Sequence, residues 1–170
     1  MSAIISDDGL YRYWLRRDLP PTLANRKKDA VTCTFIMLNP STADADDDDP
    51  TIRRCSGFAA SLRCTRLEVV NLYGYRATDP AELHTVDDPE GPENTLHLRV
   101  ALSTPGPTIA AWGTLAPPDR VAKILAMPGA DNLYCLGTNQ DGSPRHPLYL
   151  RADAAIRTFL PYSPDNRSQR

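Results

Sequence analysis

The run Val31–Leu38 (VTCTFIML) is almost continuously apolar and partly β-branched. Such a run is typical of a strand that is buried on both faces, as in a parallel sheet. A short polar loop follows it, and a helical pattern then begins at Pro50, with Asp49 as the expected N-cap and proline at the first helical position. This strand–loop–helix unit predicts an α/β fold.

The same alternation recurs along the chain. Further strands are predicted at Leu67–Leu72, Thr108–Trp112 and Leu133–Leu136, and further helices at Asn94–Leu102, Pro117–Ala126 and Ala152–Leu160. Leu10–Arg16 alternates apolar with basic residues, as an edge strand does. The expected fold is a three-layer αβα sandwich with a central, mostly parallel sheet and an N-terminal edge strand. We expect one domain over residues 1–162 and a flexible C-terminal tail over 163–170.

Composition restricts the class of protein. Hydrophobic residues make up 41% of the 170 residues and charged residues 24%, which is ordinary for a globular chain. The formal net charge is -2, so the strongly basic character of many duplex-DNA-binding proteins is missing. No signal peptide and no membrane span is recognisable, so we expect a cytoplasmic protein. We also expect it to be a monomer.

Metal and cofactor sites are not predicted. The cysteines Cys33, Cys55, Cys64 and Cys135 form no C-x-x-C pair, which argues against structural zinc and iron–sulfur clusters. Cys33 and Cys135 are expected to be buried thiols. The acidic run Asp44–Asp49 could hold Mg²⁺ or Ca²⁺, but it lacks the spacing of a calcium loop. The alternative is a solvated loop whose last members favour a helix N-terminus.

Four polar loops follow the predicted strands and should meet at one edge of the sheet, where open parallel sheets bind ligands. The candidate binding residues there are Pro40, Ser41, Thr42, Asn71, Tyr73, Tyr75, Arg76, Trp112 and Arg145. Asn39 either positions a water or caps a turn. Asn71 either reads the edge of a base or is satisfied within the protein. Tyr73, Tyr75 and Arg76 either stack on a base or pack the loop, and Trp112 belongs either to the pocket or to the core.

His146 is the second candidate catalytic residue beside Asn39. It lies in the polar segment Ser143–Pro147, next to Arg145 and before a proline. A histidine fixed in such a loop can stabilise a developing negative charge. A G-x-S-x-G elbow, a P-loop and a dinucleotide-binding G-x-G-x-x-G are absent from the sequence, so the corresponding enzyme classes are not favoured.

Several longer motifs carry a family resemblance. MLNPSTAD, DDPTIRRC, VVNLYGYRATDP, DPEGPEN, AWG and GSPRHPLYL resemble a bacterial and phage family catalogued as domain of unknown function 1643. More distantly, the order of motifs is similar to the uracil-DNA glycosylase superfamily. That resemblance implies that Asn39 positions the hydrolytic water, that Asn71 reads the base, and that His146 contacts the departing base. Met37-Leu38 replace the usual glycine, and the serine that usually follows His-Pro is missing.

The resemblance implies a nucleobase-recognising protein that binds DNA or a nucleotide and hydrolyses the N-glycosidic bond of a modified or mismatched base. The base would flip into the pocket and stack on Tyr73 or Tyr75. The alternative is a non-catalytic nucleotide or nucleic-acid binding module that uses the same pocket. A metal-dependent hydrolase built on Asp44–Asp49 is a third interpretation.

Overall fold

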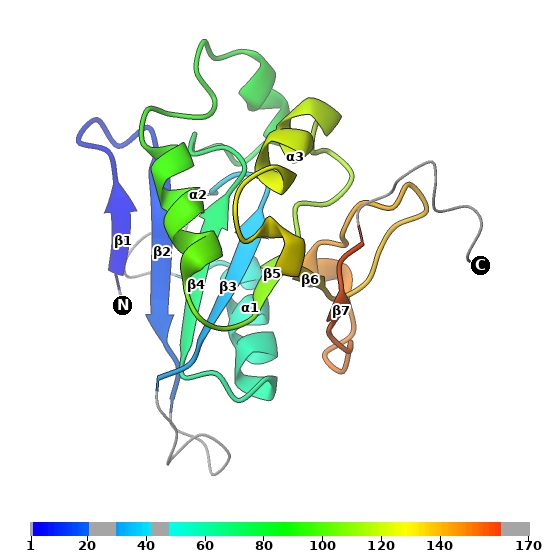
Figure 1. Ribbon diagram of the computed structural model, residues 1–170. Coiled ribbons are helices and arrows are strands. Elements are labelled where there is room, and N and C mark those ends of the chain that lie inside the picture. The colour runs from blue at the N-terminus through cyan, green and yellow to red at the C-terminus, as the bar shows by residue number, and fades with distance from the viewer. Residues whose placement is uncertain (1, 21–29, 42–47, 161–170) are drawn as a thin grey trace.

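The computed structural model describes residues 2–20, 30–41 and 48–160 of the chain. Within them a seven-stranded sheet has the order β1-β2-β4-β3-β5-β6-β7 (Figure 1). Its centre is parallel and consists of β3 (Thr32–Met37), β4 (Arg66–Asn71), β5 (Thr108–Ala110) and β6 (Tyr134–Cys135). β3, β5 and β6 lie within the runs that the sequence predicts, and β4 begins one residue before its predicted run.

The sheet as a whole is mixed rather than mostly parallel. β1 (Ser2–Ile5) pairs antiparallel with β2 (Arg12–Asp18), β2 pairs antiparallel with β4, and β6 pairs antiparallel with β7 (Arg157–Thr158). The prediction of a mostly parallel sheet is therefore wrong for the strands at both ends of the strand order. β2 is also not an edge strand, because β1 covers its outer side.

The predicted last helix is also wrong. Residues 152–160 contain no helix, and β7 lies there instead, with Tyr134 opposite Thr158 and Cys135 opposite Arg157. The backbone N–H of Phe159 also donates to the carbonyl of Leu133 over 2.8 Å. Pairing with a strand that lies more than twenty residues away has thus overridden a helical pattern in the local sequence.

Helices cover both faces of the sheet. In Figure 1, α2 (Asn94–Ser103) and α3 (Pro118–Leu125) lie in front of the sheet, and α1 (Pro50–Ser61) lies behind it. One apolar cluster joins α1 to the sheet through residues such as Ile52, Phe58 and Phe35. A second joins α2 and α3 to the other face through residues such as Leu98 and Ile124. Short 3-10 helices lie at η1 (Pro80–His84), η2 (Ala130–Asn132) and η3 (Pro147–Tyr149).

The start of α1 is fixed as the sequence predicts. A carboxylate oxygen of Asp49 accepts a hydrogen bond from the backbone N–H of Ile52 over 2.8 Å, and Pro50 occupies the first helical position. Cys55 and Phe58 are buried on the face that meets the sheet. Shortly beyond the helix, Arg63 adopts a φ of 61°, a left-handed conformation in which the chain leaves the helix. The hydroxyl of Ser41 donates to Asp49, which holds the N-terminus of α1 beside the loop that follows β3.

Three predictions fall outside the described residues. They concern Thr42, the acidic residues up to position 47, and the C-terminal tail over 163–170. Cys33 and Cys135 are buried, as predicted. In the part of the chain that the structure describes, none of the helices is long and apolar enough to cross a membrane.

Candidate functional site

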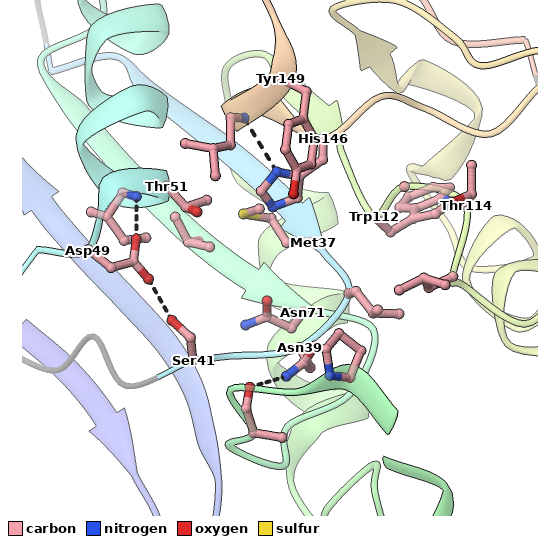
Figure 2. Close-up of a pocket in the computed structure, with 18 of the residues that line it drawn as sticks. Met37, Asn39, Ser41, Asp49, Thr51, Asn71, Trp112, Thr114, His146 and Tyr149 are labelled. Atoms are coloured by element: carbon pink, nitrogen blue, oxygen red, sulfur yellow. Dashed lines mark hydrogen bonds between the residues drawn. The ribbon is translucent and has the colours of Figure 1, made fainter. Parts of the chain in front are cut away.

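A pocket of about 610 Å³ opens at the carboxyl ends of the parallel strands (Figure 2). Six of the predicted site residues line it: Asn39, Ser41, Asn71, Trp112, Arg145 and His146. They come from the loops after β3 and β5, from the end of β4 and from the loop before η3. Pockets of 300–1,000 Å³ are typical of small-molecule and cofactor sites. The sheet edge predicted from the sequence is therefore hollowed where the candidate residues meet.

Asn39 lies in the loop after β3, and its amide is held by the backbone. Nδ2 donates to the carbonyl of Ala77 over 2.8 Å and to the carbonyl of Pro40 over 3.1 Å. Because both partners can only accept, the nitrogen is assigned and Oδ1 is left as the acceptor of this side chain. An acceptor fixed in this way can orient a water or a ligand N–H.

Asn71 is the last residue of β4 and is 1% exposed. Among the described residues, neither Nδ2 nor Oδ1 of its side chain has a hydrogen-bond partner. Leaving a buried polar group unpaired costs about 1–3 kcal/mol, and such groups in folded proteins call for a specific explanation. Since Asn71 lines the pocket, a bound ligand that offers both a donor and an acceptor would satisfy it.

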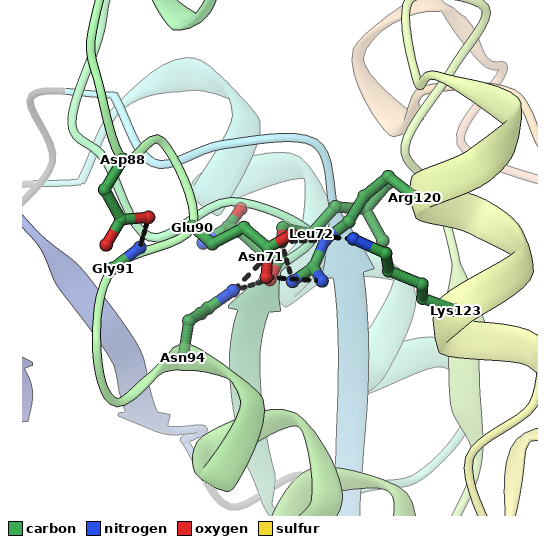
Figure 3. A network of polar contacts seen from close by, with 8 residues as sticks. All are labelled: Asn71, Leu72, Asp88, Glu90, Gly91, Asn94, Arg120 and Lys123. Carbon is green, nitrogen blue, oxygen red and sulfur yellow. Dashed lines mark hydrogen bonds and ion pairs between the residues drawn. The ribbon is translucent and has the colours of Figure 1, made fainter.

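The backbone beneath Asn71 is clamped from the other face of the sheet (Figure 3). Nδ2 of Asn94 donates to the carbonyls of Asn71 and Leu72 over 3.1 and 2.9 Å. The guanidinium of Arg120 donates twice to the carbonyl of Leu72 and once to Glu90. Asn94 and Arg120 are buried, so the end of β4 is anchored by groups that do not face the pocket.

His146 precedes η3 and has a defined tautomer. Its Nδ1 accepts a hydrogen bond from the backbone N–H of Leu148 over 3.3 Å, so the neutral ring carries its hydrogen on Nε2. Burial lowers the pKa of His146, and the charge of Asp49 opposes this effect. The site therefore contains a neutral N–H donor that does not have to be protonated before it can donate.

Asp49 and Arg12 line the pocket but were not among the predicted site residues. Asp49 accepts from Ser41 Oγ over 2.5 Å, in addition to its helix-capping bond (Figure 2). The sequence identifies it as an N-cap, and the N-terminus of a helix that follows a strand lies at the ligand-binding edge of the sheet. That argument would have placed Asp49 in the site. Arg12 lies in β2 and is 2% exposed. The sequence around it carries no motif that would mark it as a site residue.

Trp112 belongs both to the pocket and to the core. It is 3% exposed, and its ring meets Phe159 edge-on with centroids 5.5 Å apart. The loop that holds Trp112 is joined to the loop before η3, because the backbone N–H of Gly113 donates to the carbonyl of Pro144 over 3.0 Å. The loop of Arg145 is closed by its N–H, which donates to the carbonyl of Gly137 over 2.9 Å.

Four described members of the predicted binding set do not line this pocket: Pro40, Tyr73, Tyr75 and Arg76. Tyr73 lines a neighbouring cavity, and the guanidinium of Arg120 lies 5.6 Å from its ring centre. Tyr75 meets Tyr11 edge-on, and Arg76 donates to the carbonyl of Gly9 over 3.2 Å. These contacts agree with the loop-packing alternative.

Pro40 contributes its carbonyl, which accepts from the backbone N–H of Ala77 over 3.0 Å. The loops after β3 and β4 are thereby joined at the pocket. Within the described residues, no group of three or more His, Cys, Asp or Glu side chains is placed to hold a metal ion.

Comparison with known proteins identifies the family but no relative of known activity. No curated protein and no solved structure matches the chain. Residues 12–148 match the family described as "Protein of unknown function (DUF1643)", and this match covers more than half of the chain. The motifs that suggested this family in the sequence lie almost entirely within the matched residues. The chain belongs to the DUF1643 family.

Proposed function

We propose that this protein recognises a nucleobase in the pocket and hydrolyses its N-glycosidic bond, with a fold and site of the uracil-DNA glycosylase type. The observation that carries the proposal is the side-chain amide of Asn71, buried in the pocket without a partner among the described residues. Uracil, thymine, guanine and hypoxanthine each present an N–H beside a carbonyl. A planar amide edge of this kind satisfies both atoms of an asparagine side chain.

The walls of the pocket suit a flat ligand. Trp112, Met37 and Tyr149 provide apolar and aromatic surface around the polar atoms. The volume of about 610 Å³ is sufficient for a base together with its sugar. A base in a duplex would have to leave the stack to reach such a pocket.

His146 suits the departing base. When the glycosidic bond breaks, the base carries the electron pair, and its negative charge is stabilised by a donor that is already in place. The neutral ring with hydrogen on Nε2 is such a donor. The lowered pKa of His146 keeps the ring neutral near physiological pH, so no proton has to be taken up first.

Asn39 suits the attacking water. Its Oδ1 is left as an acceptor because Nδ2 is held by the carbonyls of Ala77 and Pro40. An amide positions water but does not remove its proton near neutral pH. The role of Asn39 is therefore orientation.

A second candidate function is a non-catalytic binding module for a nucleotide or nucleic acid. Two observations favour it: an amide rather than a carboxylate stands at position 39, and the formal net charge is -2. Asn71 and Trp112 would serve a binding module equally well. The two candidates differ in one property: a glycosylase releases the base from its sugar, and a binding module does not.

The test is base release from oligonucleotides that carry one uracil, hydroxymethyluracil, hypoxanthine or thymine opposite guanine. We expect wild-type protein to release at least one of these bases. Asn71→Ala should weaken binding by about 1–3 kcal/mol. Asn39→Ala and His146→Ala should reduce turnover more than binding, His146→Ala by roughly a hundredfold or more.

Asn132→Ala is the control, because Asn132 lies in η2 and does not line the pocket. Its rate should equal that of wild-type protein. Binding without base release by any variant would support the binding module. If the protein neither binds these oligonucleotides nor releases a base from them, and also binds no free nucleotide, both candidates are wrong.

A further inference from the structure

The pocket contains a carboxylate, that of Asp49, beside the three residues Asn39, Asn71 and His146. Its two oxygens accept from different donors, Oδ1 from the N–H of Ile52 and Oδ2 from the hydroxyl of Ser41. These two bonds fix the carboxylate group on both sides, so it cannot rotate freely out of the pocket.

The carboxylate retains the capacity to accept a further hydrogen. Each carboxylate oxygen has about two acceptor positions, and the bonds from Ile52 and Ser41 use one on each oxygen. The negative charge of Asp49 acts on His146, where it raises the pKa against the effect of burial. Because Asp49 and His146 line the same pocket, both face the space that a ligand would fill.

An independent feature points to a ligand at this site. Asn71 presents a buried amide without a protein partner among the described residues, and this amide lines the pocket of Asp49. The role of Asp49 thus does not depend on its position at a helix N-terminus. It depends on a carboxylate and an unsatisfied recognition group that share one cavity.

We propose that Asp49 is the general base of this site and accepts the proton of the water that Asn39 orients. This inference rests on the proposed function. Hydrolysis needs a proton acceptor, and neither the amide of Asn39 nor the N–H of His146 provides one. Among the residues that line the pocket, Asp49 contributes the carboxylate.

The step balances without a further reactant. The water oxygen bonds to the anomeric carbon of the sugar, and its proton passes to a carboxylate oxygen of Asp49. The bond from that carbon to the base nitrogen breaks, and its electron pair leaves with the base while His146 donates a hydrogen bond. The base then takes a proton from solvent, and Asp49 releases one to solvent, which restores the site.

The experiment distinguishes the role of Asp49 as a general base from its role as a helix cap. Asparagine and serine cap helices about as well as aspartate, so Asp49→Asn and Asp49→Ser should both preserve α1. With whichever oligonucleotide the wild-type protein cleaves, Asp49→Asn should lower kcat by roughly a hundredfold or more and leave the Kd for that oligonucleotide unchanged. Asp79→Asn is the matched control, since Asp79 caps η1 and does not line this pocket.

Chemical rescue provides the readout that a structural role would not change. Asp49→Ser leaves space beside Ser41, and added formate should restore part of its kcat but none of that of Asp49→Asn. A wild-type rate in Asp49→Asn, a change in Kd alone, or no rescue of Asp49→Ser would each overturn the assignment while the proposed function stands. No base release by the wild-type protein would instead overturn the proposed function, and the assignment with it.

Discussion

The backbone N–H of Leu148 donates to Nδ1 of His146 over 3.3 Å, so the residue two positions later determines the state of the imidazole. The bond leaves Nε2 as the protonated nitrogen of the neutral ring. Pro147 starts η3 between the two residues and fixes the turn that makes the bond. The histidine is therefore prepared as a hydrogen-bond donor before any ligand arrives.

We predict that NMR of the imidazole nitrogens finds the Nε2–H tautomer and a pKa below the ordinary value of 6.5. Burial disfavours the charged ring, and this is the larger effect. Asp49→Asn should lower the pKa of His146 further, because it removes a charge that raises it. The imidazole resonances of His146 are assigned by their loss in the spectrum of His146→Gln. A pKa above 6.5 would contradict this description.

The lowered pKa of His146 also predicts how the stability of the protein depends on pH. The pKa of His146 is lower in the folded than in the unfolded chain, so the unfolded chain binds the proton more readily. Its contribution is present above the unfolded value of about 6.5 and is lost as the pH falls through the folded pKa. The melting temperature of His146→Gln should therefore fall less than that of wild-type protein between neutral pH and pH 5, whereas equal losses would contradict the prediction.

Two buried asparagines should respond in opposite ways to leucine. Asn71→Leu should raise the free energy of unfolding by about 1–3 kcal/mol, because it removes a buried amide that has no partner among the described residues. Asn94→Leu should lower it by a similar amount, because Nδ2 of Asn94 donates to two backbone carbonyls. Urea unfolding measures both.

Asn71→Leu should also abolish binding of the oligonucleotides, so stability and function separate at this position. A destabilised Asn71→Leu protein would show that the amide is satisfied within the fold. That outcome would favour the structural alternative for Asn71 over the recognition of a ligand.

The network around Arg120 should contribute to stability through its buried members. Arg120→Met removes both guanidinium hydrogen bonds to the carbonyl of Leu72, where the bond from Asn94 remains, and it takes away the closest cation of Glu90. The free energy of unfolding should therefore fall by roughly 2–3 kcal/mol. Lys123 also meets Glu90, at 3.5 Å, but its side chain is 61% exposed. Lys123→Ala should therefore cost less than about 1 kcal/mol, and equal losses in the two variants would contradict the assignment.

Replacing two of the glycines by alanine should change the stability of the protein in opposite directions. Gly106 has a φ of +127°, and a Cβ there would lie 2.0 Å from the carbonyl oxygen of Thr32. Gly106→Ala should therefore destabilise the protein by about 3 kcal/mol or more. Gly57 lies in α1 with nothing near its added Cβ, so Gly57→Ala should stabilise by roughly 0.5–1 kcal/mol. Thermal melting checks both, and a destabilised Gly57→Ala would contradict the packing of α1.

The centre of the fold could be predicted from the sequence because its signals are local. Val31–Leu38 and Leu67–Leu72 are apolar runs that suit strands buried on both faces, and Asp49-Pro50 is a local helix start. The sides of the sheet depend on distant pairing. β1 is a short strand that pairs with β2, and β7 is held by β6, so neither was recognisable from its own residues.

The site was predicted in part for the same reason. Asn39 directly follows the predicted strand Val31–Leu38, Asn71 lies near the end of the predicted strand Leu67–Leu72, and His146 lies in the polar loop after Leu133–Leu136. The fold brings the three to one pocket. Tyr75 and Arg76 follow β4 just as closely, but they turn toward Tyr11 and Gly9, which come from the N-terminal part of the chain. Which loop residues face a pocket depends on such distant partners, and no pattern within the loop reveals them.

The most direct test of the central claim is the NMR signal of the Asn71 side-chain amide during titration with the oligonucleotides that carry a modified or mismatched base. The resonance is assigned by its loss in Asn71→Leu. If Asn71 reads a base, both of its amide protons shift on saturation, and one moves downfield as it donates to the ligand. Shifts that are confined to residues around Tyr75 and Arg76, with Asn71 and His146 unchanged at saturation, would contradict the account.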